Sequence, residues 1–412
     1  MTYYPYLQSK RGKWLFGVFL FVLLYITRNT MTASSLIGIQ KAQFLTLGLV
    51  AILGIGFLAA NHKCWKEILT DKRIVLMGVC TVLVLLPMLL KRDWQMMYIS
   101  ILLCVLYGIF FTFFIDLREL AKCYVVILTV VGVYSILAAY GLRLLADREI
   151  CPIPIIYNPA HIRFYFLGTY VPLNYVKMRN FGLFREPGVY QYFLTLALIL
   201  NNYVVSWKKE RSLWLCNVLL AVTMLTTMAT GGVAGLGLLV IVVFFERKLY
   251  RDKRIIALAL VLLLLLALAV GLIVMEKGEL YWELYSMVYG KIFNEEKNST
   301  ERVDAIVSDF RFFLDDPLVG GKIADVLDAV ENNTTSTMLM LAFFGIAGGL
   351  LHMGSWLALV WSGKRKIWVN ISLVLIAFLS FNTQNLIADP FFWLMPMMAL
   401  TEKVIPKLKK KE

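Results

Sequence analysis

The sequence predicts an all-α, polytopic membrane protein with about twelve transmembrane helices and two large extracytoplasmic loops. Two features of the composition predict this class: 60% of the 412 residues are hydrophobic, and only 17% are charged. A soluble protein of this length could not bury so much apolar surface. A third observation is the length of apolar runs such as 257–274, which can cross about 30 Å of hydrocarbon. Lipid offers no hydrogen-bond partners, so these runs must be helical, and we expect 1–412 to form a single integral membrane domain.

The predicted helices follow the apolar runs in order along the chain. Their expected ranges are 14–30, 42–60, 74–90, 94–115, 121–145, 188–206, 213–230, 232–246, 255–275, 335–361, 367–385 and 388–404. An even number of spans places both termini on one side of the membrane. Lys and Arg concentrate in the short segments of that side, which the positive-inside rule assigns to the cytosol. The net charge of +14 is therefore predicted to set topology and contact lipid headgroups rather than bind nucleic acid.

The same topology places two long loops, 146–187 and 276–334, outside the cytosol. The first loop carries five Lys or Arg against three Asp or Glu, and the second carries six against thirteen. Loops of this length in a compact protein are usually functional. The second loop contains the stretch 301–321, which predicts an amphipathic helix on a membrane face or against the bundle, ending at Asp316-Pro317. Its expected apolar stripe consists of Val303, Ile306, Val307, Phe310, Phe313 and Leu314.

The stretch MRNFGLFREPGVYQYFL (178–194) allows two interpretations. In the first it is an ordinary helix start, because Pro lacks the amide that would be unsatisfied there and the carboxylate of Glu186 favours the positive end of the helix dipole. In the second it is an anion site, because Arg179 and Arg185 lie on the side where basic residues are disfavoured. Guanidinium groups beside a helix N-terminus suit phosphate oxygens, and Arg163 and Lys177 lie nearby in the sequence. Glu186 would then orient an arginine or take a proton from a hydroxyl.

These residues resemble the O-antigen polymerase and O-antigen ligase superfamily, which are bacterial membrane glycosyltransferases acting on undecaprenyl-diphosphate-linked glycans. In the first loop the match consists of Arg179, Gly182, Phe184, Glu186 and Pro187, which open a span. In the second loop it consists of Arg302 followed by Asp316, Pro317, Leu318 and Gly320. The segment 332–351 is similar to the polar patch and span that come next in the family. The ligase branch commonly has a His in this patch, and its absence here favours the polymerase branch.

The resemblance implies an enzyme that polymerises undecaprenyl-diphosphate-linked oligosaccharide repeat units on the outer face of a bacterial cytoplasmic membrane. The product would be a surface polysaccharide, namely capsule, exopolysaccharide or O-antigen. We predict a multi-pass protein with cytosolic termini, and as partners the lipid-linked oligosaccharide, membrane lipid, and a flippase and chain-length regulator of the same pathway. Neither a cofactor nor a metal is expected, and Asp304, Asp309 and Asp315 fall on different faces of a helix.

The predicted site residues come from both outer loops. We predict these catalytic residues: Arg179, Arg185, Glu186 and Arg302. We predict these substrate-binding residues: Arg163, Lys177, Tyr190, Lys322 and Thr334. Two alternatives stay open, a ligase-type transfer of glycan to another acceptor and a flippase for lipid-linked oligosaccharides. The sequence contains no visible internal repeat and few charges within spans, which argues against a transporter.

Overall fold

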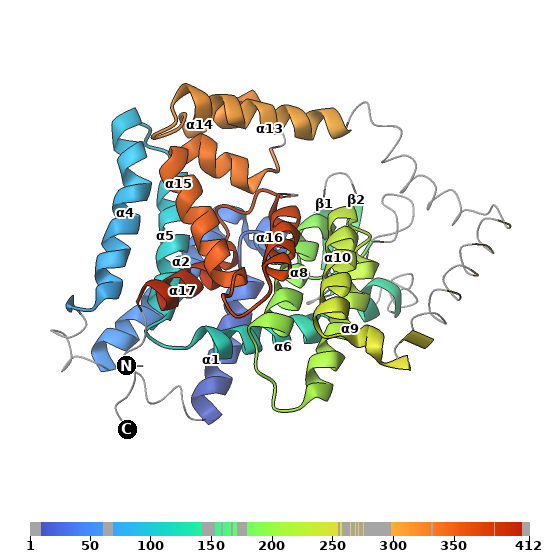
Figure 1. Cartoon of the computed structure of the whole chain (residues 1–412). Coiled ribbons are helices and arrows are strands. Elements are labelled where there is room, and N and C mark those ends of the chain that lie inside the picture. The colour runs from blue at the N-terminus through green and yellow to red at the C-terminus, as the bar shows by residue number, and fades with distance from the viewer. Residues whose placement is uncertain are drawn as a thin grey trace.

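The computed structural model of the chain describes most of the sequence and is predominantly α-helical (Figure 1). The described residues are 10–60, 69–141, 153–157, 160–165, 168–170, 179–253, 298–330, 333–382 and 384–405, with isolated positions between 256 and 275. In the first half the helices are α1 (Lys10–Tyr25), η2 (Thr32–Ile37), α2 (Ile39–Ala60), α4 (Lys72–Lys91), α5 (Met96–Phe111), α6 (Leu117–Ile136) and η4 (Leu137–Gly141). Next come α8 (Pro187–Tyr203), α9 (Glu210–Thr226), α10 (Thr230–Glu246) and η5 (Leu249–Arg251). The last are α13 (Asn298–Asp315), α14 (Ile323–Ala329), α15 (Ser336–Val360), α16 (Ile367–Phe381) and α17 (Pro390–Val404).

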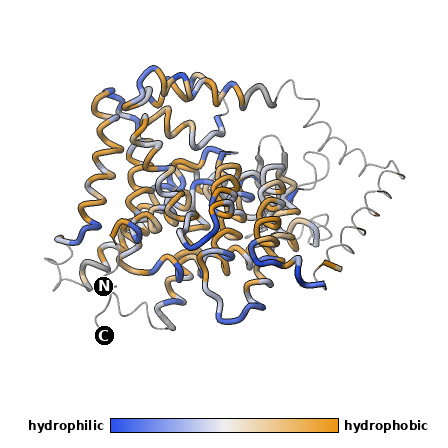
Figure 2. The backbone as a smooth tube through the Cα atoms, in the orientation of Figure 1, coloured by the Kyte–Doolittle hydropathy of each residue, from blue (hydrophilic) through white to orange (hydrophobic). Residues whose placement is uncertain are grey.

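Each predicted apolar run except 255–275, which lies mostly outside the described residues, coincides with one of these helices. Four described segments are long and apolar enough to cross a membrane: Ile39–Gly56, Lys72–Lys91, Leu117–Gly141 and Ser336–Val360. Shorter apolar helices accompany them, and hydrophobic residues make up most of the helical backbone trace (Figure 2). These helices indicate a membrane-embedded protein, while the number of twelve spans stays a prediction.

Two short helices form the centre of the bundle. Almost every residue of α8 and α17 is buried, and each helix is shorter than a typical membrane span. Tyr124 of α6 donates a hydrogen bond to the carbonyl of Phe193 in α8 over 3.1 Å, and its ring stacks on Phe391 of α17. Because α8 and α17 are apolar all round, they can lie in the interior only if other helices surround them.

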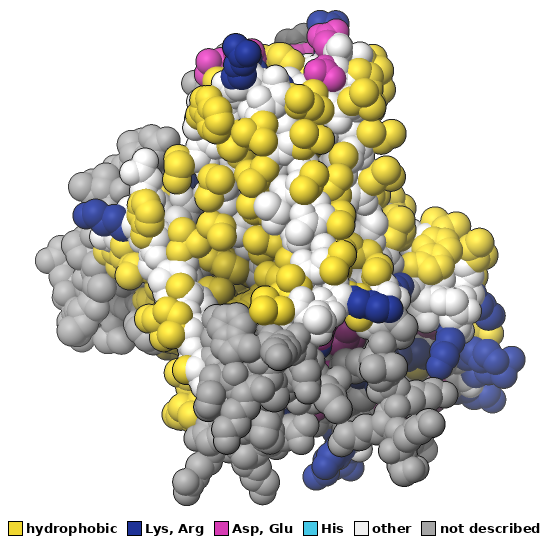
Figure 3. Space-filling model, turned by 90° about the vertical axis from the view of Figure 1, so that its left-hand side faces the viewer, with side chains coloured by type: hydrophobic (Ala, Val, Ile, Leu, Met, Phe, Trp, Pro, Cys, Tyr) yellow, Lys and Arg dark blue, Asp and Glu magenta, His cyan; other side chains and the backbone are white. Residues whose placement is uncertain are grey.

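The outer surface of the bundle carries an apolar band. On the face shown in Figure 3, hydrophobic side chains cover the middle, while acidic and basic side chains gather at the top and further Lys and Arg lie lower down. Val75, Val82 and Leu90 of α4 contribute to this surface and are between 59% and 66% exposed. Apolar side chains in such number on a surface are expected where lipid replaces water as the surroundings.

The chain is predominantly α-helical as predicted, and a small antiparallel sheet that was not predicted lies within the first loop. It consists of β1 (Ile153–Tyr157), β2 (Ala160–Tyr165) and β3 (Gly168–Tyr170), in the order β1-β2-β3. The register pairs Ile153 with Phe164 and Arg163 with Tyr170. Aromatic and β-branched residues fit a pleated surface, which explains why this aromatic loop forms strands.

Helix α13 lies across one end of the bundle, next to α14 (Figure 1). The predicted helix is confirmed and ends where expected, at Asp315, one residue before Asp316-Pro317. Its orientation is less obvious, because the face turned inward carries Ala305 and Asp309, which are 1% and 0% exposed. The apolar stripe points away from the bundle, with Val303, Ile306, Val307, Phe310 and Leu314 between 41% and 56% exposed. The helix therefore packs against the bundle, one of its two predicted settings, but does so through its polar face and not through the apolar stripe.

Candidate functional site

The approach to α8 is fixed by a turn that requires glycine. Asn180 donates from Nδ2 to Ser135 Oγ over 2.9 Å and accepts the backbone N–H of Gly182 over 2.8 Å. Gly182 has φ +57°, and a Cβ at this position would come within 2.6 Å of the Tyr190 ring. Only glycine meets both demands. The Arg-Asn-Phe-Gly turn therefore holds the next residues, Arg185 and Glu186, at one position against the bundle.

Glu186 is the N-cap of α8, with Pro187 at the first helical position. This confirms part of the ordinary helix-start interpretation, because Pro at this position costs no hydrogen bond. The Glu186 side chain, however, does not cap the helix. Its Oε1 lies 4.0 Å from Nε of Arg185, and the side chain is 37% exposed. The carboxylate is therefore accessible beside a cation, as either proposed role of Glu186 requires.

Arg185 is brought next to Arg28, a residue that the sequence did not single out. The connection after α1 pairs with the segment before α8: the amide of Arg185 donates to the carbonyl of Asn29 over 3.0 Å, and the amide of Met31 donates to Leu183 over 2.9 Å. Thr30 and Phe184 form an isolated β-bridge between these hydrogen bonds. The charges of Arg28 and Arg185 are close enough to repel each other. Two cations on adjoining segments favour the binding of an anion in this region.

Asp389 anchors this arrangement from the start of α17. It is fully buried and accepts hydrogen bonds from Asn29 Nδ2 over 2.7 Å, Thr27 Oγ1 over 3.1 Å and the amide of Phe391 over 2.9 Å. Oδ1 of Asn29 is buried and has no hydrogen-bond partner among the described residues. Asp389 thus holds the segment that contains Arg28 and balances part of its charge.

The N-termini of three helices meet around these residues. Ser336 in the first turn of α15 donates to the carbonyl of Gln384 over 2.6 Å and accepts the amide of Leu386 over 3.0 Å, which links α15 to the turn before α17. The Gln384 side chain lies against the first turn of α8, because a Cβ on Gly188 would come within 2.5 Å of its Nε2. Helix N-termini carry partial positive charge and unpaired amides. Together with the cations of Arg28 and Arg185 and the carboxylates of Glu186 and Asp389, they form a charged site, here called the Arg185 site.

Arg179 has a different environment from Arg185. Its Nε donates to the carbonyl of Thr227 over 3.1 Å, and Nη2 donates to that of Met228 over 3.4 Å, at the end of α9. A cation is favourable at this end of a helix. Burial lowers the pKa of Arg179, while nearby Glu186 opposes the shift. Arg179 therefore has a structural role. Its predicted contact with substrate would use Nη1, because Nε and Nη2 donate to the end of α9.

Helix α13 is fixed above the start of α15 through Asp309. Its carboxylate accepts hydrogen bonds from Asn333 Nδ2 and Thr335 Oγ1, both over 2.7 Å. Burial raises the pKa of Asp309 to about 6 against the effect of these hydrogen bonds. The hydroxyl of Thr334 is buried and makes no hydrogen bond to a described residue, so it can bind a ligand. Position 302 precedes Asp309 by two helical turns and lies on the same, inward face of α13.

A turn after α13 fixes the other end of this helix. Ile346 donates its amide to the carbonyl of Pro317 over 2.8 Å, at the point where Gly345 breaks α15 with φ +61° and ψ −155°. A Cβ on Gly345 would come within 2.5 Å of the backbone of Leu318. Lys91 donates to the carbonyls of Gly321 and Phe343 over 2.6 and 2.7 Å. The turn that contains the Asp-Pro-Leu-x-Gly motif, residues 316–321, therefore packs into the break of α15 and is here called the plug.

The other predicted site residues have varied surroundings. Tyr190 is fully buried, shares a hydrogen bond of 3.1 Å with Ser135 and supports the Gly182 turn, so its geometry favours a supporting role over direct substrate contact. Lys322 is exposed at the N-cap of α14. Arg163 belongs to β2, where the structure describes the backbone alone, and Lys177 lies outside the described residues.

Among the described residues no group of three or more His, Cys, Asp or Glu could hold a metal ion. No protein-family model matches the chain, and no curated protein matches it. The described helices define a predominantly helical, membrane-embedded protein, with a charged site where three helices begin.

Proposed function

We propose that the protein polymerises oligosaccharide repeat units carried on undecaprenyl diphosphate, at the outer face of a bacterial cytoplasmic membrane. The observation that supports the proposal is the backbone pairing that joins the segments of Arg28 and Arg185 where three helices begin, beside the accessible carboxylate of Glu186. This arrangement suits a diphosphate that gains charge as it leaves a sugar, because fixed cations and helix dipoles stabilise developing negative charge.

In the proposed reaction a hydroxyl of the incoming lipid-linked unit attacks the anomeric carbon of the growing glycan. The bond between that carbon and the diphosphate oxygen breaks, and both bonding electrons leave with undecaprenyl diphosphate. Glu186 takes the proton of the attacking hydroxyl, since its carboxylate lies next to the site of the leaving group, 4.0 Å from Arg185 Nε. The sugar–diphosphate bond supplies the free energy, so the reaction needs no nucleotide sugar.

Helix α13 would close the sugar side of this site. Asp309 fixes it over the start of α15, where the hydroxyl of Thr334 is unpaired, and position 302 lies on its inward face. Arg302 is proposed to add a further positive charge toward the diphosphate. Arg179 contributes by holding the segment that carries Arg185 and Glu186.

Removal of the protein from its host tests the proposal against both alternatives. Loss of a polymerase leaves single repeat units on undecaprenyl diphosphate at the outer leaflet, where an added glycosidase can reach them. Single units confined to the cytosolic leaflet would instead indicate a flippase. Full-length polymer retained on undecaprenyl diphosphate would indicate a ligase, because transfer to the final acceptor would then be the missing step.

A further inference from the structure

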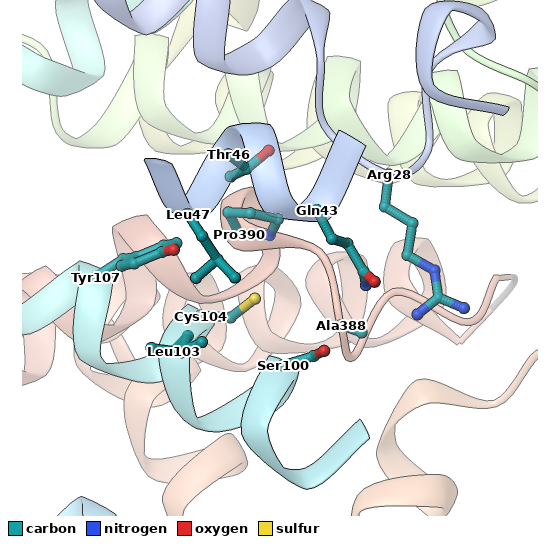
Figure 4. Close-up of a pocket in the computed structure, with 10 residues that line it drawn as sticks. All are labelled: Arg28, Gln43, Thr46, Leu47, Ser100, Leu103, Cys104, Tyr107, Ala388 and Pro390. Carbon is teal, nitrogen blue, oxygen red and sulfur yellow. The ribbon is translucent and has the colours of Figure 1, made fainter. Parts of the chain in front are cut away.

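A pocket between α2 and α5 extends from the Arg185 site toward the surface of the bundle. Figure 4 shows its lining: Arg28 at one end, Gln43 and Leu47 from α2, and Ser100, Leu103 and Tyr107 from α5. The turn before α17 closes the floor. Residues 100, 103, 104 and 107 recur at helical spacing, so a single face of α5 lines the pocket.

Two polar groups of this pocket could contact a ligand. The guanidinium group of Arg28 lines the pocket and interacts with two other charges, the attractive one of Asp389 and the repulsive one of Arg185. The hydroxyl of Tyr107 has no hydrogen-bond partner among the described residues, although the side chain is only 6% exposed. Buried polar groups are normally hydrogen-bonded, so an unpaired hydroxyl that lines a cavity indicates a ligand.

The pocket changes in polarity along its length. Arg28, Gln43 and Ser100 lie toward one end, and Leu47, Leu103 and Cys104 lie toward the other (Figure 4). Leu47 and Leu103 are partly exposed, so the apolar end reaches the outside of the bundle. Beside it, the apolar surface of α2 continues through Phe44 and Leu45, which are 66% and 49% exposed. A ligand with an anionic head and a hydrocarbon chain matches this gradient.

We propose that this pocket binds the first isoprenoid segment of a polyprenyl diphosphate, with the diphosphate held between Arg28 and Arg185 and the chain leaving between α2 and α5. The inference rests on the proposed function, which requires such a donor, and adds the site and direction of its lipid. The pocket is narrow, so the remainder of the chain lies along the exposed face of α2. The hydroxyl of Tyr107 donates a hydrogen bond to the ligand or to a water that accompanies the ligand.

Lipid binding by the purified full chain tests this assignment without any sugar transfer. Native mass spectrometry would measure bound undecaprenyl diphosphate for the wild type, for Arg28→Gln and for Leu103→Trp, which fills the pocket. Leu215→Trp is the matched control, because Leu215 is 60% exposed on α9 and lines neither the pocket nor the face of α2. Inorganic diphosphate and phosphatidylglycerol serve as probes for the headgroup alone and for an ordinary anionic lipid.

We expect both pocket variants to bind undecaprenyl diphosphate at least about tenfold more weakly, as loss of a charged hydrogen bond or of buried chain surface implies. Leu103→Trp leaves binding of inorganic diphosphate unchanged, and Leu215→Trp behaves as wild type. Wild-type affinity in both pocket variants would overturn the assignment, and so would equal affinity for phosphatidylglycerol. Lipid binding that depends on the pocket, in a protein that never forms polymer, would support the pocket and overturn the polymerase. Polymer formation, together with lipid binding that neither pocket variant weakens, would support the polymerase and overturn the pocket.

Discussion

The amide of Arg185 donates a hydrogen bond of 3.0 Å to the carbonyl of Asn29. This contact joins two segments that are more than 150 residues apart in the sequence, the turn after α1 and the entry to α8. Because of it, Arg28 and Arg185 belong to adjoining segments, and Asp389 holds the turn through its hydrogen bond from Asn29. The central claim, an anion site for a lipid diphosphate, depends on this pairing.

Arg185 is predicted to act on the reaction rather than on stability. Arg185→Ala should lower the rate of polymerisation by about 10²–10³-fold, the usual cost of removing a donor that stabilises a leaving group. Arg185→Lys should recover part of the rate, because it keeps the charge but loses the planar fork. The matched control is Arg211→Ala, an exposed arginine at the other end of the α8–α9 hairpin. Polymer yield and thermal unfolding measured together would expose a merely structural effect.

Arg179 is predicted to affect both stability and activity. Arg179→Ala removes two hydrogen bonds to the carbonyls of Thr227 and Met228, which should cost about 1–3 kcal/mol of unfolding free energy. The resulting loss of activity should be partly rescued at low temperature, because the Arg185 site remains intact in the folded fraction. An unchanged unfolding temperature in this variant would contradict a structural role for Arg179.

The docking of α13 is predicted to depend on pH through Asp309. Burial raises the pKa of Asp309 to about 6 in the folded protein, above the usual value of about 3.9. The folded state therefore binds the proton more tightly, so this contribution to stability is greatest below about pH 4. It falls as pH rises to about 6 and then stays constant, a change on the order of 3 kcal/mol at most.

Asp309→Asn should flatten this dependence, because the amide imitates the protonated acid. Proteolysis of α13 in wild type and variant at pH 4.5 and 7.5 measures the difference. Equal pH dependence in the two proteins would show that Asp309 does not titrate in this range.

Gly345 is predicted to be indispensable for the plug formed by residues 316–321. Gly345→Ala should destabilise the docked turn by roughly 1–3 kcal/mol from backbone strain alone, and the overlap with Leu318 adds to this cost. Gly354→Ala in the same helix is the control, since a Cβ there meets no atom within 4 Å. Hydrogen exchange of residues 316–323 should accelerate in the first variant alone. Equal exchange in the two variants would contradict the role of the plug.

The sequence predicted the helices well, because long apolar runs and the Asp316-Pro317 stop are local signals. It also indicated Arg185 and Glu186 through their position at a helix start, and Thr334 through the family resemblance of the polar patch. It missed Arg28, since an isolated arginine after an apolar run looks like a membrane-boundary residue until its distant partner is known. The pairing with residues 183–185 has no local signature.

Two further differences have physical reasons. The strands β1 to β3 lie in the first outer loop, where no strand was predicted, because strand pairing depends on tertiary contacts and local propensity indicates it only weakly. The sequence did not predict which face of α13 turns inward, because the contact with the bundle is polar, through Asp309 with Asn333 and Thr335. The apolar stripe indicates the opposite face of the helix.

The most direct measurement incubates the purified protein in nanodiscs with the repeat unit on undecaprenyl diphosphate, without nucleotide sugar and with a chelator. Products are separated on a gel for wild type, Arg185→Ala, Arg302→Ala and the Arg211→Ala control. The account predicts a ladder spaced by one repeat unit for wild type and control, and single units for the other two variants. Wild-type ladders from both Arg185→Ala and Arg302→Ala would contradict the diphosphate site, and the absence of a ladder from every protein would contradict the polymerase.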